Sequence, residues 1–173
     1  MEFVIRPVEV SDARGINLLR RMPGVFENIL GIPSERVKRN EDFIMSMDSN
    51  HHQMVAITKD NNGEDILIGT AGLMVSANLR MRHSGSIGLM IHKDYQNMGV
   101  GTALMKALID IADNWLMLIR VDLDVFEDNE RAIHIYEKLG FEKEGLKKLA
   151  SIRNGKYINE YTMARIHPSY DHK

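Results

Sequence analysis

The segment YQNMGVGTAL, at residues 95–104, joins a predicted strand to a predicted helix through two closely spaced glycines. Gly99 and Gly101 let the backbone approach a ligand closely. The first N–H groups of a helix have no partner within the helix, and the helix dipole favours an anion at that end. A phosphate or pyrophosphate group is therefore the ligand that this loop predicts.

Three other interpretations of the loop are available. The ATP- and GTP-binding pattern G-x-x-x-x-G-K-[ST] is absent, which argues against nucleotide hydrolysis. A dinucleotide-binding loop requires G-x-G-x-x-G, and Leu104 stands in place of the third glycine. Such a loop also follows an early parallel strand, whereas predicted antiparallel hairpins precede this one. The remaining alternative is a plain tight turn that binds nothing.

Apolar residues after the loop recur at intervals of three and four, which predicts an amphipathic helix. These residues are Val100, Ala103, Leu104, Ala107, Leu108, Ile111 and Trp115. A further helix is expected over 130–139, because Asn129 is a good N-cap residue and Gly140 a good residue to follow its end. Two more helices are expected over 13–22 and 33–47. Strands are expected over 2–8, 53–59, 65–77, 84–92, 119–126, 141–153 and 156–166.

The resulting order is β-α-α-β-β-β-α-β-α-β-β. Antiparallel hairpins surround one central parallel crossover, so the fold class is α/β (α+β) with a mixed seven-stranded sheet. We see no repeat, low-complexity segment or linker, and we expect a single domain over residues 1–173.

Composition excludes several classes of protein. The formal net charge of −2 lacks the basic surface of a dedicated nucleic-acid binder. No apolar run is long enough to span a bilayer and no signal peptide is visible, so we expect a cytoplasmic protein without a membrane partner. The chain has no cysteine, which excludes disulfides and an acyl group carried on a thiol. The seven histidines show no metal-binding spacing, and we expect no metal.

Two ordered motifs resemble those of the GNAT superfamily of acyl-CoA N-acyltransferases. Gln96-x-x-Gly99-x-Gly101 is similar to the family's Q/R-x-x-G-x-G/A signature, and NERAIHIYEKLGF at 129–141 is similar to its second conserved block. The resemblance extends to the opening strand and the closing strands, and so covers essentially the whole chain. It implies the GNAT fold, acetyl-CoA as the acyl donor and N-acetyl transfer within a ternary complex. It also implies a homodimer.

The resemblance also implies roles for individual residues. Tyr136 matches the tyrosine that protonates the departing CoA thiolate, and Asn129 matches a residue that holds the pantetheine end or a site water. The backbone of one strand segment pairs with the pantetheine arm; it comprises Leu89, Met90 and Ile91. The residues of the pyrophosphate-binding loop are Gln96, Asn97, Met98, Gly99, Val100, Gly101 and Thr102.

The general base departs from the family pattern. Many members carry a glutamate on the fourth strand, and Ser86 occupies that position here. Asp124 matches a carboxylate that serves some members on the next strand. Asp122 is a second candidate because it alternates onto the same strand face. His92 is a third, because imidazole titrates near neutral pH.

The missing glutamate indicates an acceptor that loses its proton easily. An α-amine with a pKa near 7.7–8.0 costs about 1 kcal/mol to deprotonate at pH 7, whereas a lysine-type amine costs roughly 4–5 kcal/mol. We therefore expect an amino acid, a peptide N-terminus or another amine of low pKa. The alternatives are a non-catalytic acyl-CoA sensor on the same fold and a nucleotide-binding module.

Overall fold

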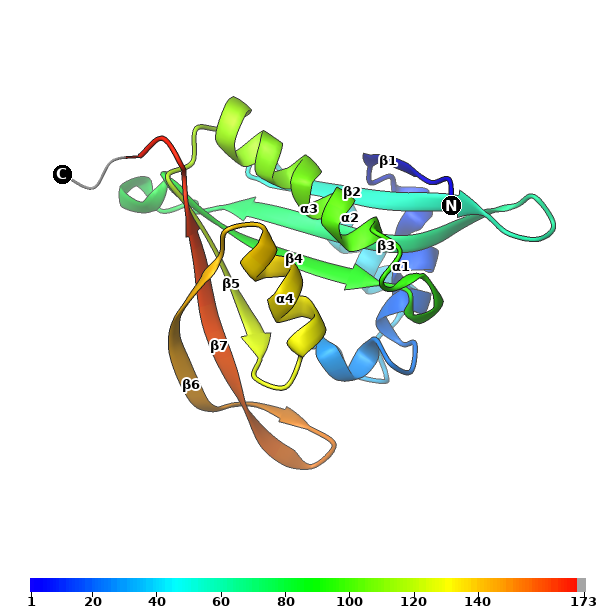
Figure 1. Cartoon of the computed structure of the whole chain (residues 1–173). Helices are drawn as coiled ribbons and strands as arrows, with labels where there is room; N and C mark the ends of the chain where they lie inside the picture. The colour runs from blue at the N-terminus through cyan, green and yellow to red at the C-terminus, as the bar shows by residue number, and fades with distance from the viewer. Residues whose placement is uncertain (171–173) are drawn as a thin grey trace. The chain divides into compact units, whose positions relative to one another are not determined.

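A computed structural model describes residues 1–170 and gives a seven-stranded mixed sheet with four α-helices. The strands are hydrogen-bonded in the order β1-β2-β3-β4-β5-β7-β6, so β1 and β6 are the edge strands. The strands are β1 Val4–Pro7, β2 His51–Lys59, β3 Asp65–Val75, β4 Ser84–Ile91, β5 Arg120–Phe126, β6 Glu142–Arg153 and β7 Lys156–Ile166. The helices are α1 Ala13–Arg20, α2 Val37–Met45, α3 Val100–Asp110 and α4 Glu130–Lys138 (Figure 1).

The chain forms two compact units, and each combines two separate stretches of sequence. Unit 1 comprises Met1–Leu73 and Gly88–Leu108, and unit 2 comprises Met74–Ile87 and Ile109–Lys173. The predicted elements and their order are confirmed, with the expected helix over 33–47 beginning later, at Val37. The expected single domain stays a prediction, and the last three residues of its range, 171–173, lie outside the described residues.

In unit 1, β1 and β2 are antiparallel, and Val4 pairs with Ile57 and Pro7 with Met54. Helix α3 lies over one face of these strands, and α1 and α2 lie over the other (Figure 1). Both faces of the strands are therefore covered. The fully buried side chains come from α1, β2, β3 and α3; among them are Leu19, Val55, Ile68, Leu104 and Leu108.

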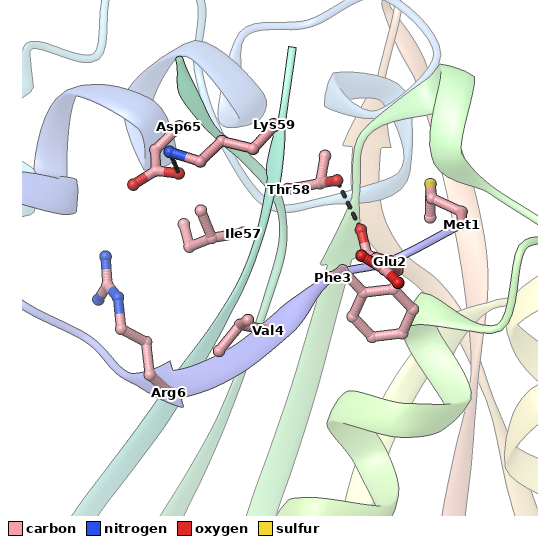
Figure 2. Close-up of a pocket in the computed structure, with 9 residues that line it drawn as sticks. All are labelled: Met1, Glu2, Phe3, Val4, Arg6, Ile57, Thr58, Lys59 and Asp65. Atoms are coloured by element: carbon pink, nitrogen blue, oxygen red, sulfur yellow. Dashed lines mark hydrogen bonds and ion pairs between the residues drawn. The ribbon is translucent and has the colours of Figure 1, made fainter. Parts of the chain in front are cut away.

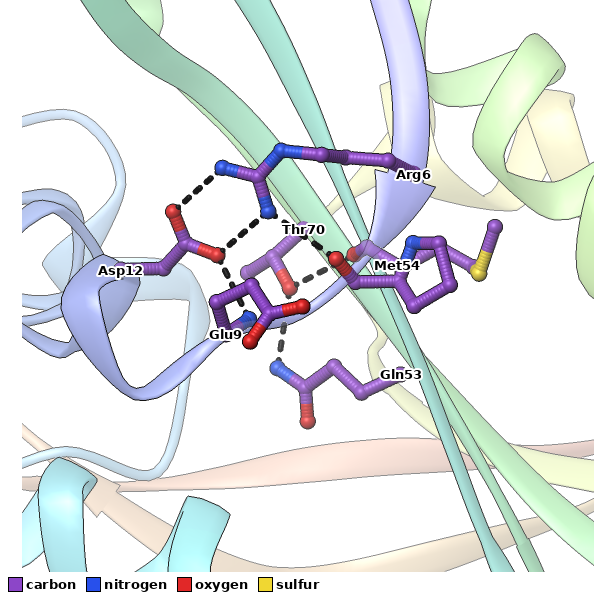
Figure 3. A network of polar contacts seen from close by, with 7 residues as sticks. Arg6, Glu9, Asp12, Gln53, Met54 and Thr70 are labelled. Carbon is purple, nitrogen blue, oxygen red and sulfur yellow. Dashed lines mark hydrogen bonds and ion pairs between the residues drawn. The ribbon is translucent and has the colours of Figure 1, made fainter.

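Hydrogen bonds between polar groups fix the segment that connects β1 to α1 in unit 1. The Arg6 guanidinium donates two hydrogen bonds of 2.8 Å to the Asp12 carboxylate, which also accepts from the Glu9 N–H at 2.8 Å (Figure 3). Burial acts to raise the pKa of Asp12, but these hydrogen bonds outweigh it and lower that pKa. Asp12 is therefore held by Arg6 and Glu9, and its side chain accepts no capping hydrogen bond from α1 although it occupies the N-cap position.

In unit 2, β5 is antiparallel to β7 over its whole length, from Arg120↔Ile166 to Phe126↔Glu160. The pairing of β6 with β7 is interrupted by two register shifts, the second between Lys147 and Ser151. Alternate residues of β5 are buried, namely Val121, Leu123 and Val125. The residues between them point to the opposite, polar face.

The expected apolar stripe of α3 does not continue to Trp115. The last turn, Ile111–Trp115, is a π-helix, and Trp115 is 77% exposed. A π-turn inserts an extra residue between hydrogen-bonded groups and so shifts the phase of the stripe. Ala112 remains buried, and Asp113 accepts two hydrogen bonds of 2.8 Å from Arg165 of β7. This buried ion pair joins the π-turn to the sheet of unit 2.

Candidate active site

The predicted pyrophosphate loop lies in unit 1 between the end of β4 and the start of α3. The Gln96 side chain donates to the Ile91 carbonyl at 3.2 Å, which closes the loop onto the strand end. Asn97 and Gly99 have φ values of 63° and 85°. A Cβ at Gly99 would meet no atom within 4 Å, so the positive φ is the reason for glycine at this position.

The loop leads into the first turn of α3, where the predicted anion-binding N–H groups lie. Asn97, Met98 and Gly99 are exposed, whereas Val100 and Gly101 are buried in the first helical turn. The Ala103 N–H donates to the Gly99 carbonyl at 3.0 Å, so helical hydrogen bonding begins there. The N–H groups before Ala103 have no acceptor within the helix, and they precede an eleven-residue α-helix.

The strand segment predicted to pair with pantetheine, Leu89–Ile91, ends β4. The parallel pairing of β4 with β5 covers only three residue pairs, from Ser84↔Arg120 to Ser86↔Asp122. A Cβ at Gly88 would meet no atom within 4 Å, so there is open space beside the backbone where the segment begins. Backbone N–H and C=O groups without a strand partner can pair with an extended ligand.

Gly69 of β3 supports this segment, and sequence reasoning did not single it out. A Cβ here would lie 2.7 Å from Ile91 Cδ1, 3.1 Å from Leu104 Cδ1 and 3.3 Å from the Met90 carbonyl oxygen. Glycine therefore allows β3, the end of β4 and α3 to approach closely. A glycine inside an apolar strand is the signal that could have identified it.

Tyr136 lies in unit 2 on the inner face of α4, beside buried Ile133. Its side chain is 5% exposed, and its ring centroid lies 5.9 Å from that of Phe141. Burial raises the pKa of Tyr136 to about 12. The phenol therefore keeps its proton throughout the physiological range, as a proton donor must before it acts.

Asn129 occupies the N-cap position of α4, as the sequence predicted. Its side-chain oxygen accepts from the Ala132 N–H at 3.3 Å, and its own N–H donates to the Phe126 carbonyl at 3.0 Å. The residue therefore fixes the turn between β5 and α4, and its side-chain NH₂ group carries its remaining donors.

Asp124 is held by two neighbouring strands on the polar face of unit 2. Its Oδ2 accepts from Lys147 Nζ of β6 at 2.7 Å, and its Oδ1 accepts from Thr162 Oγ1 of β7 at 2.8 Å. The Asp124 side chain is nevertheless 43% exposed. No sequence signal identified Lys147 or Thr162, because strand register decides which residues meet Asp124. Thr162 is its partner in the β5–β7 ladder, and the bulged β6–β7 register brings Lys147 to it.

The other candidates for the base differ in their surroundings. Asp122 lies 3.3 Å from Arg120 Nε, and Arg120 also forms two hydrogen bonds to Glu144. Asp122 is therefore partly neutralised. His92 follows β4 in unit 1, where burial lowers its pKa and its Nδ1 accepts from the Asp94 N–H at 3.2 Å. Its imidazole is thus neutral at pH 7.

A pocket of about 660 Å³ opens elsewhere in unit 1, along β1 and β2, and contains none of the predicted site residues (Figure 2). Both of its cations are paired: Arg6 with Asp12, and Lys59 with Asp65 at 2.7 Å. It is lined by Met1, Glu2, Phe3, Val4, Arg6, Ile57, Thr58, Lys59 and Asp65. Its arginine and lysine side chains are thus already paired within the protein.

Residues 1–170 contain no group of three or more histidine, aspartate or glutamate side chains placed to hold a metal ion. Within the same range, no helix is long and apolar enough to cross a membrane.

Comparisons with known proteins agree on the family. The sequence model of the Acetyltransferase (GNAT) family matches residues 23–141. An L-amino acid N-acetyltransferase of Escherichia coli, AaaT, is 33% identical over 95% of this chain and 98% of its own length. A spermidine N(1)-acetyltransferase of E. coli is 37% identical, over 49% of this chain and 47% of its own.

Solved structures show the same fold. A GNAT-family acetyltransferase from Streptococcus pneumoniae superposes with a TM-score of 0.79 and 26% identity, covering 96% of this chain and 99% of that one. The spermidine N-acetyltransferase of Vibrio cholerae in complex with CoA and spermine has a TM-score of 0.80. It is 23% identical, and the match covers 95% of each chain.

Proposed function

Because this chain belongs to the GNAT family of acetyltransferases and takes its acyl group from acetyl-CoA, we propose that it acetylates the α-amine of an amino acid or peptide. The observation that carries this proposal is the likeness to an L-amino acid N-acetyltransferase over nearly the full length of both chains. The spermidine N(1)-acetyltransferase from the same organism matches only about half of this chain, and the spermidine N-acetyltransferase of V. cholerae matches 95% of it at the lower identity of 23%.

We assign the donor-binding residues by their chemistry. The N–H groups of 99–102 hold the pyrophosphate of acetyl-CoA, with Gln96, Asn97 and Met98 shaping the loop. The backbone of Leu89, Met90 and Ile91 pairs with the amides of the pantetheine arm. Asn129 holds the pantetheine end through its side-chain NH₂ group.

The reaction is a direct transfer. The neutral amine nitrogen attacks the acetyl carbonyl carbon, the carbon–sulfur bond then breaks, and the CoA thiolate receives the proton of the Tyr136 hydroxyl. The amine's proton passes to Asp124, directly or through water. The absence of cysteine supports this single displacement, because no thiol of the protein could carry the acetyl group.

Asp124 is preferred over the other candidate bases because it matches the carboxylate that serves some family members and because Thr162 orients it. Each of the two aspartates has a cation beside it, Lys147 at Asp124 and Arg120 at Asp122. We also expect the active protein to be a cytoplasmic homodimer, as the family resemblance implies. Light scattering coupled to gel filtration would measure that oligomeric state.

The test is CoA release in the presence of acetyl-CoA and separate pools of amino acids, peptides, polyamines and aminoglycosides. The protein has no cysteine, so every thiol detected comes from CoA. We expect release with amino acids or peptides. Faster release with polyamines would contradict the proposed acceptor. Binding of acetyl-CoA without release from any pool would support the alternative, an acyl-CoA sensor, which Ser86 in the position of the usual glutamate favours.

A further inference from the structure

The polar face of unit 2 carries ion pairs at two positions along β5. Arg120 pairs with Glu144 and Asp122, and Asp124 pairs with Lys147. Arg120 lies in the part of β5 that is hydrogen-bonded to β4, opposite Ser84. Asp124 lies beyond the last pair, Ser86↔Asp122, in the part of β5 that has no such partner.

The Asp124–Lys147 pair is ordered but accessible. Thr162 Oγ1 orients one carboxylate oxygen, and Lys147 Nζ lies 2.7 Å from the other. The two side chains are 43% and 51% exposed. Exposed ion pairs of this kind contribute little to stability, so a small ligand can separate the two groups at little cost. Thr162 would keep Asp124 oriented when Lys147 turns away.

Resting on the proposed function, we propose that Lys147 and Asp124 together recognise a zwitterion, the α-ammonium and α-carboxylate of a free amino acid. The acceptor's ammonium binds Asp124 and its carboxylate binds Lys147. The complex thereby replaces one internal ion pair with two intermolecular ones. Lys147 is thus the residue that makes the site specific for amino acids.

The same pair selects against polyamines. A polyamine brings ammonium groups only, so when one of them binds Asp124, Lys147 loses its partner and repels the rest of the ligand. Lys147 keeps its charge, because Asp124, together with nearby Glu160 and Asp122, raises its pKa. The charge on Lys147 therefore discriminates between the two acceptor classes.

Lys147 also assists the chemistry of a free amino acid. A carboxylate next to an amine favours the ammonium form and raises its pKa. When Lys147 neutralises that carboxylate, the pKa of the α-amine falls. Asp124 can then remove the amine's proton more easily.

The experiment compares a free L-amino acid with its carboxamide, which keeps the α-amine but has no carboxylate. In K147Q we expect the KM for the amino acid to rise about tenfold or more, equivalent to about 1.4 kcal/mol, with the KM for the amide unchanged. K147R keeps the charge and should restore most of the amino-acid KM. K148Q removes the same charge from the neighbouring exposed residue of β6 and should leave both KM values unchanged.

A parallel rise in both KM values in K147Q, or no change in either, would overturn the proposal, because only loss of the carboxylate contact separates the two acceptors. K147E should lower the KM for spermidine relative to the wild type, and an unchanged value would argue against selection by charge. If the wild-type enzyme acetylates the amide but K147Q behaves like wild type, the inference fails and the proposed function stands. If the wild type uses no α-amine at all, the proposed function itself fails.

Discussion

At the scale of single residues, burial shifts the pKa values of two candidate proton-transfer groups in opposite directions. It raises the pKa of Tyr136 to about 12, so the phenol holds its proton. It lowers the pKa of His92, so that imidazole stays neutral. The chain thus offers a protonated phenol at position 136 and a neutral imidazole at position 92. This division is what acetyl transfer requires of an acid and a base.

Tyr136→Phe removes only the hydroxyl. We expect kcat to fall about 10²-fold or more, since a positioned general acid contributes about 10²–10⁴-fold. The affinity for acetyl-CoA, measured by calorimetry, should stay within about threefold of wild type. A full loss of acetyl-CoA binding would indicate that the tyrosine has a structural role and is not the general acid.

The same variant should change the stability of the protein at high pH. The pKa of Tyr136 is raised by folding from 10.0 to about 12, so the neutral form stabilises the folded state fully below pH 10. That contribution is lost as the pH rises from 10 towards 12, and it amounts to about 2–3 kcal/mol. Urea unfolding at pH 8 to 11 should therefore show a steeper loss of stability in wild type than in Tyr136→Phe. Parallel curves would argue against a phenol buried in this way.

At the scale of elements, the loop before α3 and the contact of β3 with the end of β4 position the groups that we propose bind the acetyl donor. Gly99 supplies a backbone conformation with φ of 85°, and Gly69 supplies space. The two glycines therefore act by different physical means. Substitution by alanine tests each effect, because alanine adds a single methyl group. At Gly99 that group strains the backbone, and at Gly69 it meets neighbouring atoms.

Gly99→Ala should cost about 1 kcal/mol of stability through backbone strain and should raise the Kd for acetyl-CoA about fivefold or more. The matched control is Gly63→Ala in the β2–β3 turn, which has φ of 81° and likewise meets no atom within 4 Å. It should cost similar stability with an unchanged Kd. Equal Kd values for acetyl-CoA in the two variants would show that the loop does not contribute to acetyl-CoA binding.

Gly69→Ala should destabilise the protein by about 1–3 kcal/mol, because its Cβ would lie 2.7 Å from Ile91 Cδ1, 3.1 Å from Leu104 Cδ1 and 3.3 Å from the Met90 carbonyl oxygen, so the side chains and the strand end must shift together. It should also weaken acetyl-CoA binding, since the displaced strand end contains the predicted pantetheine-pairing segment. Gly72→Ala on the same strand places its Cβ 3.4 Å from Gln53 Oε1, an ordinary contact. Chemical denaturation of both should show a clear loss only for Gly69→Ala.

At the scale of the whole molecule, the expected single domain predicts that the chain unfolds cooperatively. Each compact unit contains two distant parts of the sequence, and β3, β4 and α3 each contribute residues to both. Neither unit can therefore form from one uninterrupted stretch of chain. This connectivity favours unfolding as one cooperative transition.

The chain's only tryptophan, Trp115, belongs to unit 2 and gives a local probe of that unit. We expect urea transitions followed by Trp115 fluorescence and by far-ultraviolet circular dichroism to coincide. Acetyl-CoA at about 100 times its Kd should shift both together, by about 2.7 kcal/mol. A fluorescence transition separated from the dichroism transition would show that the two units unfold independently.

The sequence alone determined the elements, their order and the loop before α3, because periodicity, caps and glycines act over a few neighbouring residues. It also predicted the N-cap of α4 at Asn129, which the structure has, whereas the site roles of Tyr136 and Asn129 stay predictions from the family resemblance. Only the tertiary structure decided that Lys147 and Thr162 hold Asp124, that Gly69 lies against Ile91 and that Trp115 is exposed. These outcomes depend on strand register, on close approach between elements and on one π-turn. Such features arise from packing between residues far apart in the chain, which no local pattern records.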